Sequence, residues 1–201
     1  LWATLRGESD RALLIGGHLD FVPNGGWLDG CLNVLAGVEG LRRIAAEGTP
    51  PVTVRLVDWA DEEGARFGRS LLGSSAASGT LVPDQVRSLK DKDGVALPDA
   101  LAEYGGDLDK MKEAGHQLRN AAAYLELHIE QGPLLEAEHK TIGVVDRGQG
   151  IIWYNGTVAG FAAHAGTTPM PLRRDALAAL AEVVLAVEKL ARDHGPHAVG
   201  T

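Results

Sequence analysis

ALLIG, residues 12–16, is a short apolar run that ends in glycine, a pattern typical of a buried β-strand. A second run of this kind, VTVRLV at 52–57, follows a Gly-Thr-Pro-Pro break. Between the two runs, apolar residues recur every three to four positions, as they do along one face of a helix; they are Val34, Val38, Leu41 and Ala45. Strand, helix and strand within about 45 residues form a βαβ unit. The sequence therefore predicts an α/β fold whose mixed sheet is partly parallel and flanked by helices.

Further elements are predicted along the rest of the chain. They are short helices within 80–118, strands over 125–129, 142–145 and 151–159, and a strongly amphipathic helix over 175–192. Two glycines near residue 149 interrupt the pattern. We therefore expect one domain over residues 1–148 and the first part of a second domain over residues 149–201.

The composition excludes several classes of protein. The chain has 201 residues, of which 45% are hydrophobic, so it can bury a sizeable core. Its net charge of −8 argues against a nucleic-acid partner, because such binding needs a basic surface. Cys31 is the single cysteine, which rules out an intrachain disulfide and a cysteine-rich metal site. No apolar run approaches the roughly 20 residues of a membrane span. We expect a cytoplasmic protein with no membrane partner.

Histidine and carboxylate residues follow the predicted strands. His18 and Asp20 come directly after the first strand, Glu62 and Glu63 follow the second, and His128 lies in the strand predicted at 125–129. Each of them alone has an ordinary structural explanation, such as a hydrogen-bonded pair or a solvated helix start. Functional groups collect, however, at the carboxyl ends of strands in open α/β sheets. Imidazole nitrogen and carboxylate oxygen are zinc ligands, and hydrolytic sites often hold two metals. The pattern therefore favours a metal site.

Four ordered segments resemble the motifs of one family. They are GHLDFVPNGG at 17–26 with LDG at 28–30, DEEGARF at 61–67, LELHIEQGP at 125–133 and AHAGTTPM at 163–170. The first three resemble the metal motifs of the amidase/hydantoinase/carbamoylase branch of the zinc aminoacylase-like metallopeptidase superfamily. The fourth resembles the signature of an inserted dimerisation domain in that branch. Members of the branch include N-carbamoyl-L-amino-acid hydrolases, β-ureidopropionases and allantoate amidohydrolases.

The resemblance implies a set of metal ligands. His18 and His128 would hold one divalent metal ion, Glu63 would hold another, and Asp29 would bridge the two. Asp20 matches a carboxylate that orients His18, as carboxylates beside metal-bound histidines usually do. Nitrogen and oxygen ligands suit zinc, while manganese, cobalt and nickel remain open.

The resemblance also implies the catalytic groups and the assembly. Glu62 matches the general base that takes a proton from the attacking water and passes it to the departing nitrogen. Gln131 matches a residue that contacts the substrate. His164 matches a histidine that reaches the active site of the partner subunit, where it could stabilise the oxyanion. The implied architecture is a di-metal exopeptidase-like catalytic domain with the start of an α+β, ferredoxin-like dimerisation (lid) domain, and a homodimer is expected.

The chain departs from the family pattern at some positions. The family often has serine at the position of Gly17, and serine or threonine at that of Phe21. At the position of Asn33 it often has glycine. None of the three matches a metal ligand. The last metal-binding histidine of the family is expected beyond residue 201, and the arginine that binds the substrate carboxylate is not covered. We therefore expect an internal piece of a protein about twice as long, inactive by itself.

The expected reaction of the parent protein is hydrolysis of a linear C–N amide bond in a ureido acid. An N-carbamoyl-L-amino acid would give the amino acid, ammonia and carbon dioxide. Allantoate deimination, or cleavage of a peptide or an acyl-amino acid, is the alternative within the class. A catalytically inert binding or assembly module that keeps the fold is the alternative outside it.

Overall fold

The computed structural model describes all residues, Leu1–Thr201. The chain divides into two compact units, Leu1–Gly143 and Val144–Thr201. The first contains the sheet and the helices packed on it, and the second contains one long helix with the segments that precede and follow it. The assignment of the second unit to a dimerisation domain stays a prediction.

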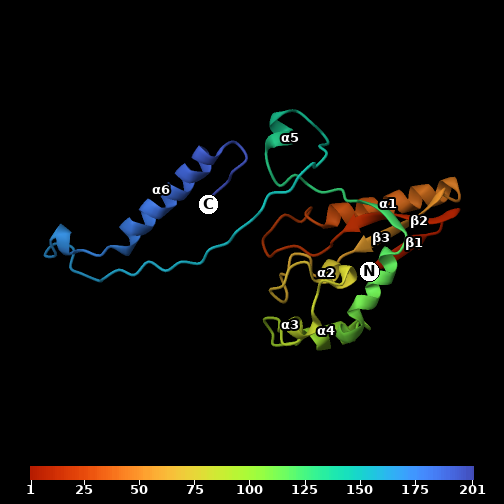
Figure 1. Ribbon diagram of the computed structural model, residues 1–201, viewed down its shortest axis with the longest axis horizontal. Helices are drawn as coiled ribbons and strands as arrows, with labels where there is room; N and C mark the ends of the chain where they lie inside the picture. Colours follow the sequence, from red (N-terminus) through yellow and green to blue (C-terminus); the bar gives the residue numbers. More distant parts are fainter. The chain divides into compact units, whose positions relative to one another are not determined.

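A mixed four-stranded sheet forms the centre of the first unit (Figure 1). Its strands, in the order β1-β3-β2-β4, are β1 (Trp2–Leu5), β2 (Ser9–Gly17), β3 (Val52–Asp58) and β4 (Ala121–Leu125). β2 is parallel to both β3 and β4, whereas β1 is antiparallel to β3. The predicted βαβ unit and the partly parallel sheet are confirmed. Three parallel strands end at the same edge of the sheet, which brings the segments after them together.

Helix α1 (Cys31–Glu47) makes the crossover between β2 and β3 and packs against both strands. It approaches the sheet closely at Gly37, where a Cβ atom would lie 2.5 Å from the Cδ1 atom of Leu56. The helix ends at Gly48, just before two prolines that cannot continue it. The predicted helix is therefore confirmed, and its first turn begins beside the carboxyl edge of the sheet.

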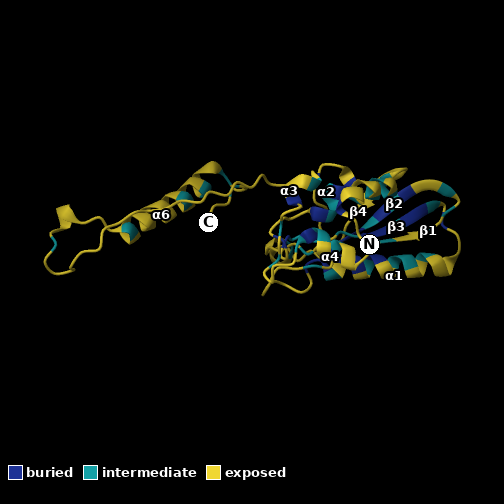
Figure 2. Cartoon of the chain, turned by 90° about the horizontal axis from the view of Figure 1, so that it is seen from below, coloured by how far each residue is buried: buried dark blue, intermediate teal, exposed yellow.

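Short helices between β3 and β4 build a second apolar core. They are α2 (Leu72–Ser78), α3 (Pro83–Val86), α4 (Leu97–Glu103) and the 3-10 helix η1 (Leu108–Leu118). Leu81 and Leu97 are each only 1% exposed in this core, and Figure 2 shows buried residues on β2, β3 and α2. Phe67 packs into the same cluster. The loop that follows β3 is thereby anchored, and this loop carries Glu62 and Glu63.

The third parallel strand lies earlier in the chain than predicted. β4 spans Ala121–Leu125 rather than 125–129, and its ladder with β2 ends at the pair Ile15–Leu125. The chain then leaves the sheet, followed by the short helix α5 (Leu134–Ala137). His128 therefore lies in the loop beyond the strand. Three successive alanines, with no hydrophobic alternation, conceal the beginning of β4 in the sequence.

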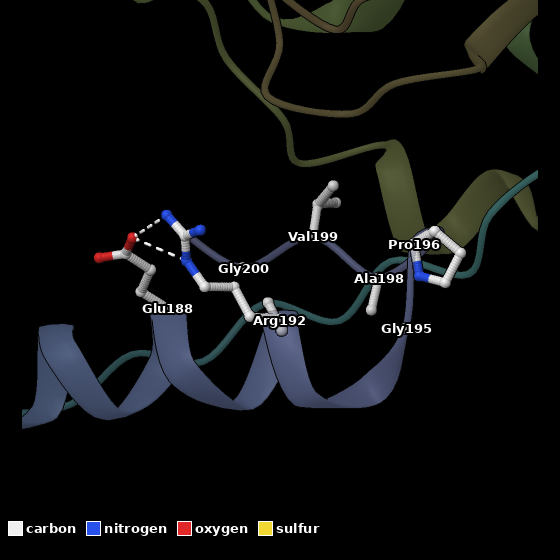
Figure 3. A pocket seen from close by; sticks show the side chains of 8 residues that line it. Glu188, Arg192, Gly195, Pro196, Ala198, Val199 and Gly200 are labelled. Atoms are coloured by element: carbon white, nitrogen blue, oxygen red, sulfur yellow. Dashed lines mark hydrogen bonds and ion pairs between the residues drawn. The ribbon is translucent and has the colours of Figure 1, made fainter.

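The second unit consists of the 3-10 turn η2 (Met170–Leu172), helix α6 (Ala176–His194) and extended segments. The Asp175 carboxylate accepts the N–H groups of Leu177 and Ala178 and so caps α6. The segment after α6 folds back along its last turns and leaves an open hollow beside the Glu188–Arg192 ion pair (Figure 3). The predicted helix is confirmed, and none of the helices is both long and apolar enough to cross a membrane.

The strands predicted over 142–145 and 151–159 do not form. A strand needs a neighbouring strand to accept and donate its main-chain hydrogen bonds. The unit Val144–Thr201 contains no strand. Its apolar segments are therefore extended and exposed, and Trp153 is 87% accessible.

Candidate metal and catalytic site

The carboxyl edge of the parallel strands collects most of the predicted site residues. His18 is the first residue after β2, and the pair Glu62-Glu63 lies in the turn after β3. His128 follows β4, and Asp29 immediately precedes the glycine that begins α1. The common edge explains why residues more than one hundred positions apart in the sequence meet.

The two histidines present the same ring nitrogen to the site. The Nδ1 atom of His18 lies 2.8 Å from the main-chain oxygen of Asp20, and that of His128 lies 2.6 Å from the main-chain oxygen of Ile129. A carbonyl oxygen only accepts hydrogen bonds, so each Nδ1 carries the proton and donates it. In the neutral ring, Nε2 then keeps its lone pair. Both side chains therefore turn Nε2, the nitrogen that a metal would bind, toward the site.

Both Nε2 atoms face the same carboxylate oxygen. The Oδ1 atom of Asp29 lies 3.8 Å from Nε2 of His18 and 3.1 Å from Nε2 of His128. Asp29 is 8% exposed, and its Oδ1 atom has no hydrogen-bond partner. A buried carboxylate oxygen without a donor is costly unless a cation neutralises it. The three residues therefore fit a divalent metal ion.

Glu63 offers a second metal position. One ligand atom each from His18, Asp29 and Glu63 lies within 4.8 Å of the other two. Burial, and then the neighbouring Asp29 carboxylate, raise the pKa of Glu63. The negative charges at this point repel one another, and a bound cation would relieve that repulsion. The donor set of His18, Asp29 and Glu63 therefore suits a divalent cation.

The field of these carboxylates also acts on His18. Burial would lower the pKa of His18, but the Asp20 carbonyl and the carboxylates of Glu62, Asp20 and Asp29 together raise it. The surroundings thus favour positive charge at the imidazole. The same field attracts a metal cation to Nε2.

Glu62 lies beside the predicted metal ligands. Its Oε2 atom lies 3.6 Å from Nε2 of His18. Burial is the main reason that the pKa of Glu62 is raised. A carboxylate with a raised pKa accepts a proton more readily, which is the property a general base needs.

Asp20 holds the turn after β3 against the end of β2. Its Oδ1 atom accepts the N–H group of Glu62 at 3.1 Å and its Oδ2 atom accepts that of Glu63 at 2.9 Å. The main-chain oxygen of Asp20 meanwhile holds His18. Asp20 therefore fixes both glutamates relative to the histidine.

Gly30 allows α1 to begin beside His18. Its φ of +83° lies in the left-handed region, and a Cβ atom would lie 2.5 Å from the main-chain oxygen of His18. Any other residue would displace the histidine or the start of the helix. This constraint explains why glycine directly follows Asp29.

Gln131 and His164 have different surroundings. The Nε2 atom of Gln131 donates to Oδ2 of Asp29, so this side chain belongs to the edge of the site. His164 lies in the unit Val144–Thr201 and is exposed. Its Nδ1 atom accepts the N–H groups of Gly166 at 3.0 Å and Thr167 at 3.3 Å. In the neutral ring its proton must therefore be on Nε2, which is free to donate.

One residue at this edge escapes the motif-based prediction. Glu126 accepts hydrogen bonds from Tyr124 and Asn33, and an oxygen of its carboxylate lies within 4.8 Å of a ring nitrogen of both His18 and His128. The sequence contains a signal for it, because residues two apart in an extended chain point to the same side. Glu126 and His128 have that spacing.

Paired imidazoles and carboxylates at the carboxyl ends of parallel strands are typical of metal-dependent hydrolases. The chain belongs to peptidase family M20/M25/M40, whose family model matches residues 14–201, and within it to the hydantoinase/carbamoylase branch.

Named relatives agree with this assignment. The chain is 44% identical over 192 residues to an N-carbamoyl-L-amino acid amidohydrolase of Geobacillus stearothermophilus, covering 94% of this chain and 46% of the relative. It is 35% identical to allantoate deiminase 1 of Glycine max, and the match covers 92% of this chain and 39% of that relative. The crystal structure of a hydantoinase/carbamoylase family amidase from Burkholderia ambifaria matches with a TM-score of 0.72 and 38% identity. This match covers 97% of this chain and 47% of the chain in the crystal. The chain thus spans about half the length of these relatives.

Proposed function

We propose that this chain is the metal-binding part of an amidohydrolase that cleaves the linear C–N bond of N-carbamoyl-L-amino acids. The observation that carries the proposal is that the Nε2 atoms of two histidines, whose Nδ1 atoms are held by main-chain oxygens, face the orphaned Oδ1 atom of Asp29, with Glu62 beside them. An inert module has no use for a buried carboxylate oxygen without a donor at this point. Similarity to amidohydrolases named for this substrate class supports the choice of reaction.

The chain offers ligands for two divalent metals. His18, His128 and Asp29 would hold one, and Asp29 and Glu63 would contribute to the other. When bound, the metals polarise the carbonyl of the substrate and make water nucleophilic at neutral pH. Zinc is the metal we propose, because imidazole and carboxylate ligands suit it.

Proton transfer falls to Glu62. It takes a proton from the attacking water while the new C–O bond forms at the carbamoyl carbon. It then gives that proton to the departing nitrogen as the C–N bond breaks, and ammonia leaves. The carbamate that remains decomposes to the amino acid and carbon dioxide. Gln131, whose amide donates to Asp29, is the proposed substrate contact.

The substrate can be tested directly on the whole protein as its gene encodes it. We expect ammonia release from N-carbamoyl-L-amino acids, measured with a coupled assay, and loss of that activity after chelation. The D enantiomers provide a matched control, since the relatives are named for the L series. Absence of ammonia from every L substrate, in protein shown to contain metal, would contradict the proposal.

Allantoate is the second candidate substrate. The similarity to a plant allantoate deiminase favours it. It is also a linear ureido compound and so needs the same attack on a carbonyl beside nitrogen. Faster ammonia release from allantoate than from any N-carbamoyl-L-amino acid would select it.

We further propose that the protein is a cytoplasmic homodimer in which His164 completes the site of the partner subunit. The hydrogen bonds to Nδ1 leave Nε2–H free, which is the donor an oxyanion needs. The loop carrying His164 is braced by Arg173, whose guanidinium donates to the main-chain oxygens of Ala165 and Thr168. His164 thus has the opposite tautomer from the two proposed metal ligands.

A mixing experiment tests this shared site. We expect the His164→Ala and Glu62→Gln variants of the whole protein to be inactive separately and to recover activity when their subunits exchange. One intact centre per heterodimer would form from Glu62 of one subunit and His164 of the other. His194→Ala, on the exposed end of α6, serves as the control histidine and should be active alone. If exchange is confirmed and no activity returns, His164 does not act across the interface.

A further inference from the structure

Glu126 is the centre of a hydrogen-bond chain that joins three elements. Its Oε2 atom accepts the hydroxyl proton of Tyr124 at 2.6 Å, and its Oε1 atom accepts the amide N–H of Asn33 at 3.2 Å. Tyr124 in turn accepts the indole N–H of Trp59 at 3.1 Å. This series of hydrogen bonds thus connects the residue after β3, the end of β4 and the first turn of α1. Each carboxylate oxygen of Glu126 therefore accepts one hydrogen bond.

The Asn33 contact is built into the packing of β2 against α1. Asn33 is 2% exposed, and Glu126 is the partner of its side-chain amide. Its space exists because residue 17 is glycine, where a Cβ atom would lie 2.0 Å from Nδ2 of Asn33. The other polar atom of Asn33, Oδ1, is buried without a partner. A buried amide with one unsatisfied atom is costly. The hydrogen bond to Glu126 therefore spares Asn33 a second unsatisfied polar atom.

Glu126 lies close to both histidines without binding their Nδ1 atoms. One carboxylate oxygen and one nitrogen from each ring all lie within 4.8 Å of one another. The Nδ1 protons, however, go to main-chain oxygens. Its effect on the rings is therefore the negative charge that it adds beside them.

We propose that Glu126 is a positioning residue that Tyr124 and Asn33 hold off the metal, so that its fixed charge strengthens cation binding by His18 and His128. This inference rests on the proposed metal-dependent function. A cation at this position meets one carboxylate ligand, Asp29, and two neutral rings. The charge of Glu126 supplies further neutralisation, and its two hydrogen bonds keep it from displacing a ligand or the substrate. The residue after β3 is also held at the end of β2, because the main-chain N–H of Trp59 donates to the main-chain oxygen of Gly17 at 2.7 Å.

The test measures metal affinity rather than activity. The whole protein is stripped of metal and titrated with zinc against a chromophoric chelator, and its cobalt form is examined by absorption spectroscopy. We expect Glu126→Gln to weaken the tighter zinc site by about 10-fold or more, because the substitution removes one negative charge within a few ångströms of the cation. Tyr124→Phe should weaken it less, in the same direction. The cobalt ligand-field bands should keep their energies, because the ligands are unchanged.

Glu103→Gln provides the matched control. It removes one carboxylate charge from the exposed end of α4 and should leave zinc affinity unchanged. A purely structural role of Glu126 would lower Tm and leave the affinity of the folded protein alone, and that result would overturn the proposal. A cobalt spectrum showing a lost ligand would also overturn it, since Glu126 would then bind the metal. If Glu126→Gln does not fold, unchanged affinity in Tyr124→Phe would be decisive. Wild-type protein that binds no zinc would contradict the proposed function itself, and the inference with it.

Discussion

Replacing Glu62 by glutamine is expected to lower turnover by about 10²- to 10⁴-fold, the usual contribution of a general acid–base group. The amide has nearly the same shape as the carboxylate but cannot accept the proton of the attacking water. The main-chain N–H of residue 62 still reaches the Asp20 carboxylate, so the turn that holds both glutamates should persist. Metal content should therefore remain at the wild-type level.

The neighbouring glutamate gives the matched comparison. Glu63→Gln makes the same chemical change one residue further along and should lower metal content as well as turnover. Both variants are assayed for ammonia release and for bound metal in the whole protein. Activity near the wild-type level in Glu62→Gln would reject it as the base. Loss of metal in Glu62→Gln alone would show that the two glutamates have exchanged roles.

The two central strands of the sheet, β2 and β3, can be predicted because their signals are strong and local. β2 and β3 are apolar runs bounded by glycine and proline, and α1 between them has a regular apolar face. The start of β4 cannot be placed in this way, because Ala121, Ala122 and Ala123 carry no alternation. Its position is set by pairing with β2, and that contact spans more than a hundred residues of sequence. The segment 151–159 has the composition of a strand but has no neighbouring strand to pair with in its unit.

In the candidate site, too, local sequence signals predict some features, and contacts between distant segments decide the others. The positions of His18, Glu62 and Glu63 follow from the rule that functional groups gather where parallel strands end. Which ring nitrogen each histidine presents could not be predicted, because it depends on main-chain carbonyls such as that of Ile129. The role of Asp20 is also broader than the motif implies. Its carboxylate binds the main chain of both glutamates, and its main-chain oxygen orients His18.

Asp29→Asn is expected to remove most of the bound metal from both positions while leaving the metal-free protein at least as stable as the wild type. The two effects have one cause. The Asp29 carboxylate is buried, its Oδ1 atom has no donor, and it raises the pKa of the nearby Glu63. Without a cation this charge is unfavourable, and an amide of the same size removes it. With a cation present, the same charge is the ligand that both metals share.

Two measurements on the whole protein separate these effects. Metal content is determined after dialysis against zinc, and Tm is measured with a chelator present. His18→Ala is the comparison variant, since His18 is proposed to ligate only one metal; it should lose about half of the bound zinc. In the chelated state the Asp29→Asn variant should match or exceed the Tm of wild-type protein, and addition of zinc should raise Tm for the wild type alone. Equal metal content in wild type and Asp29→Asn would refute the bridging role. A lower Tm for the variant in chelator would show that a protein donor, rather than a metal, satisfies the Asp29 carboxylate.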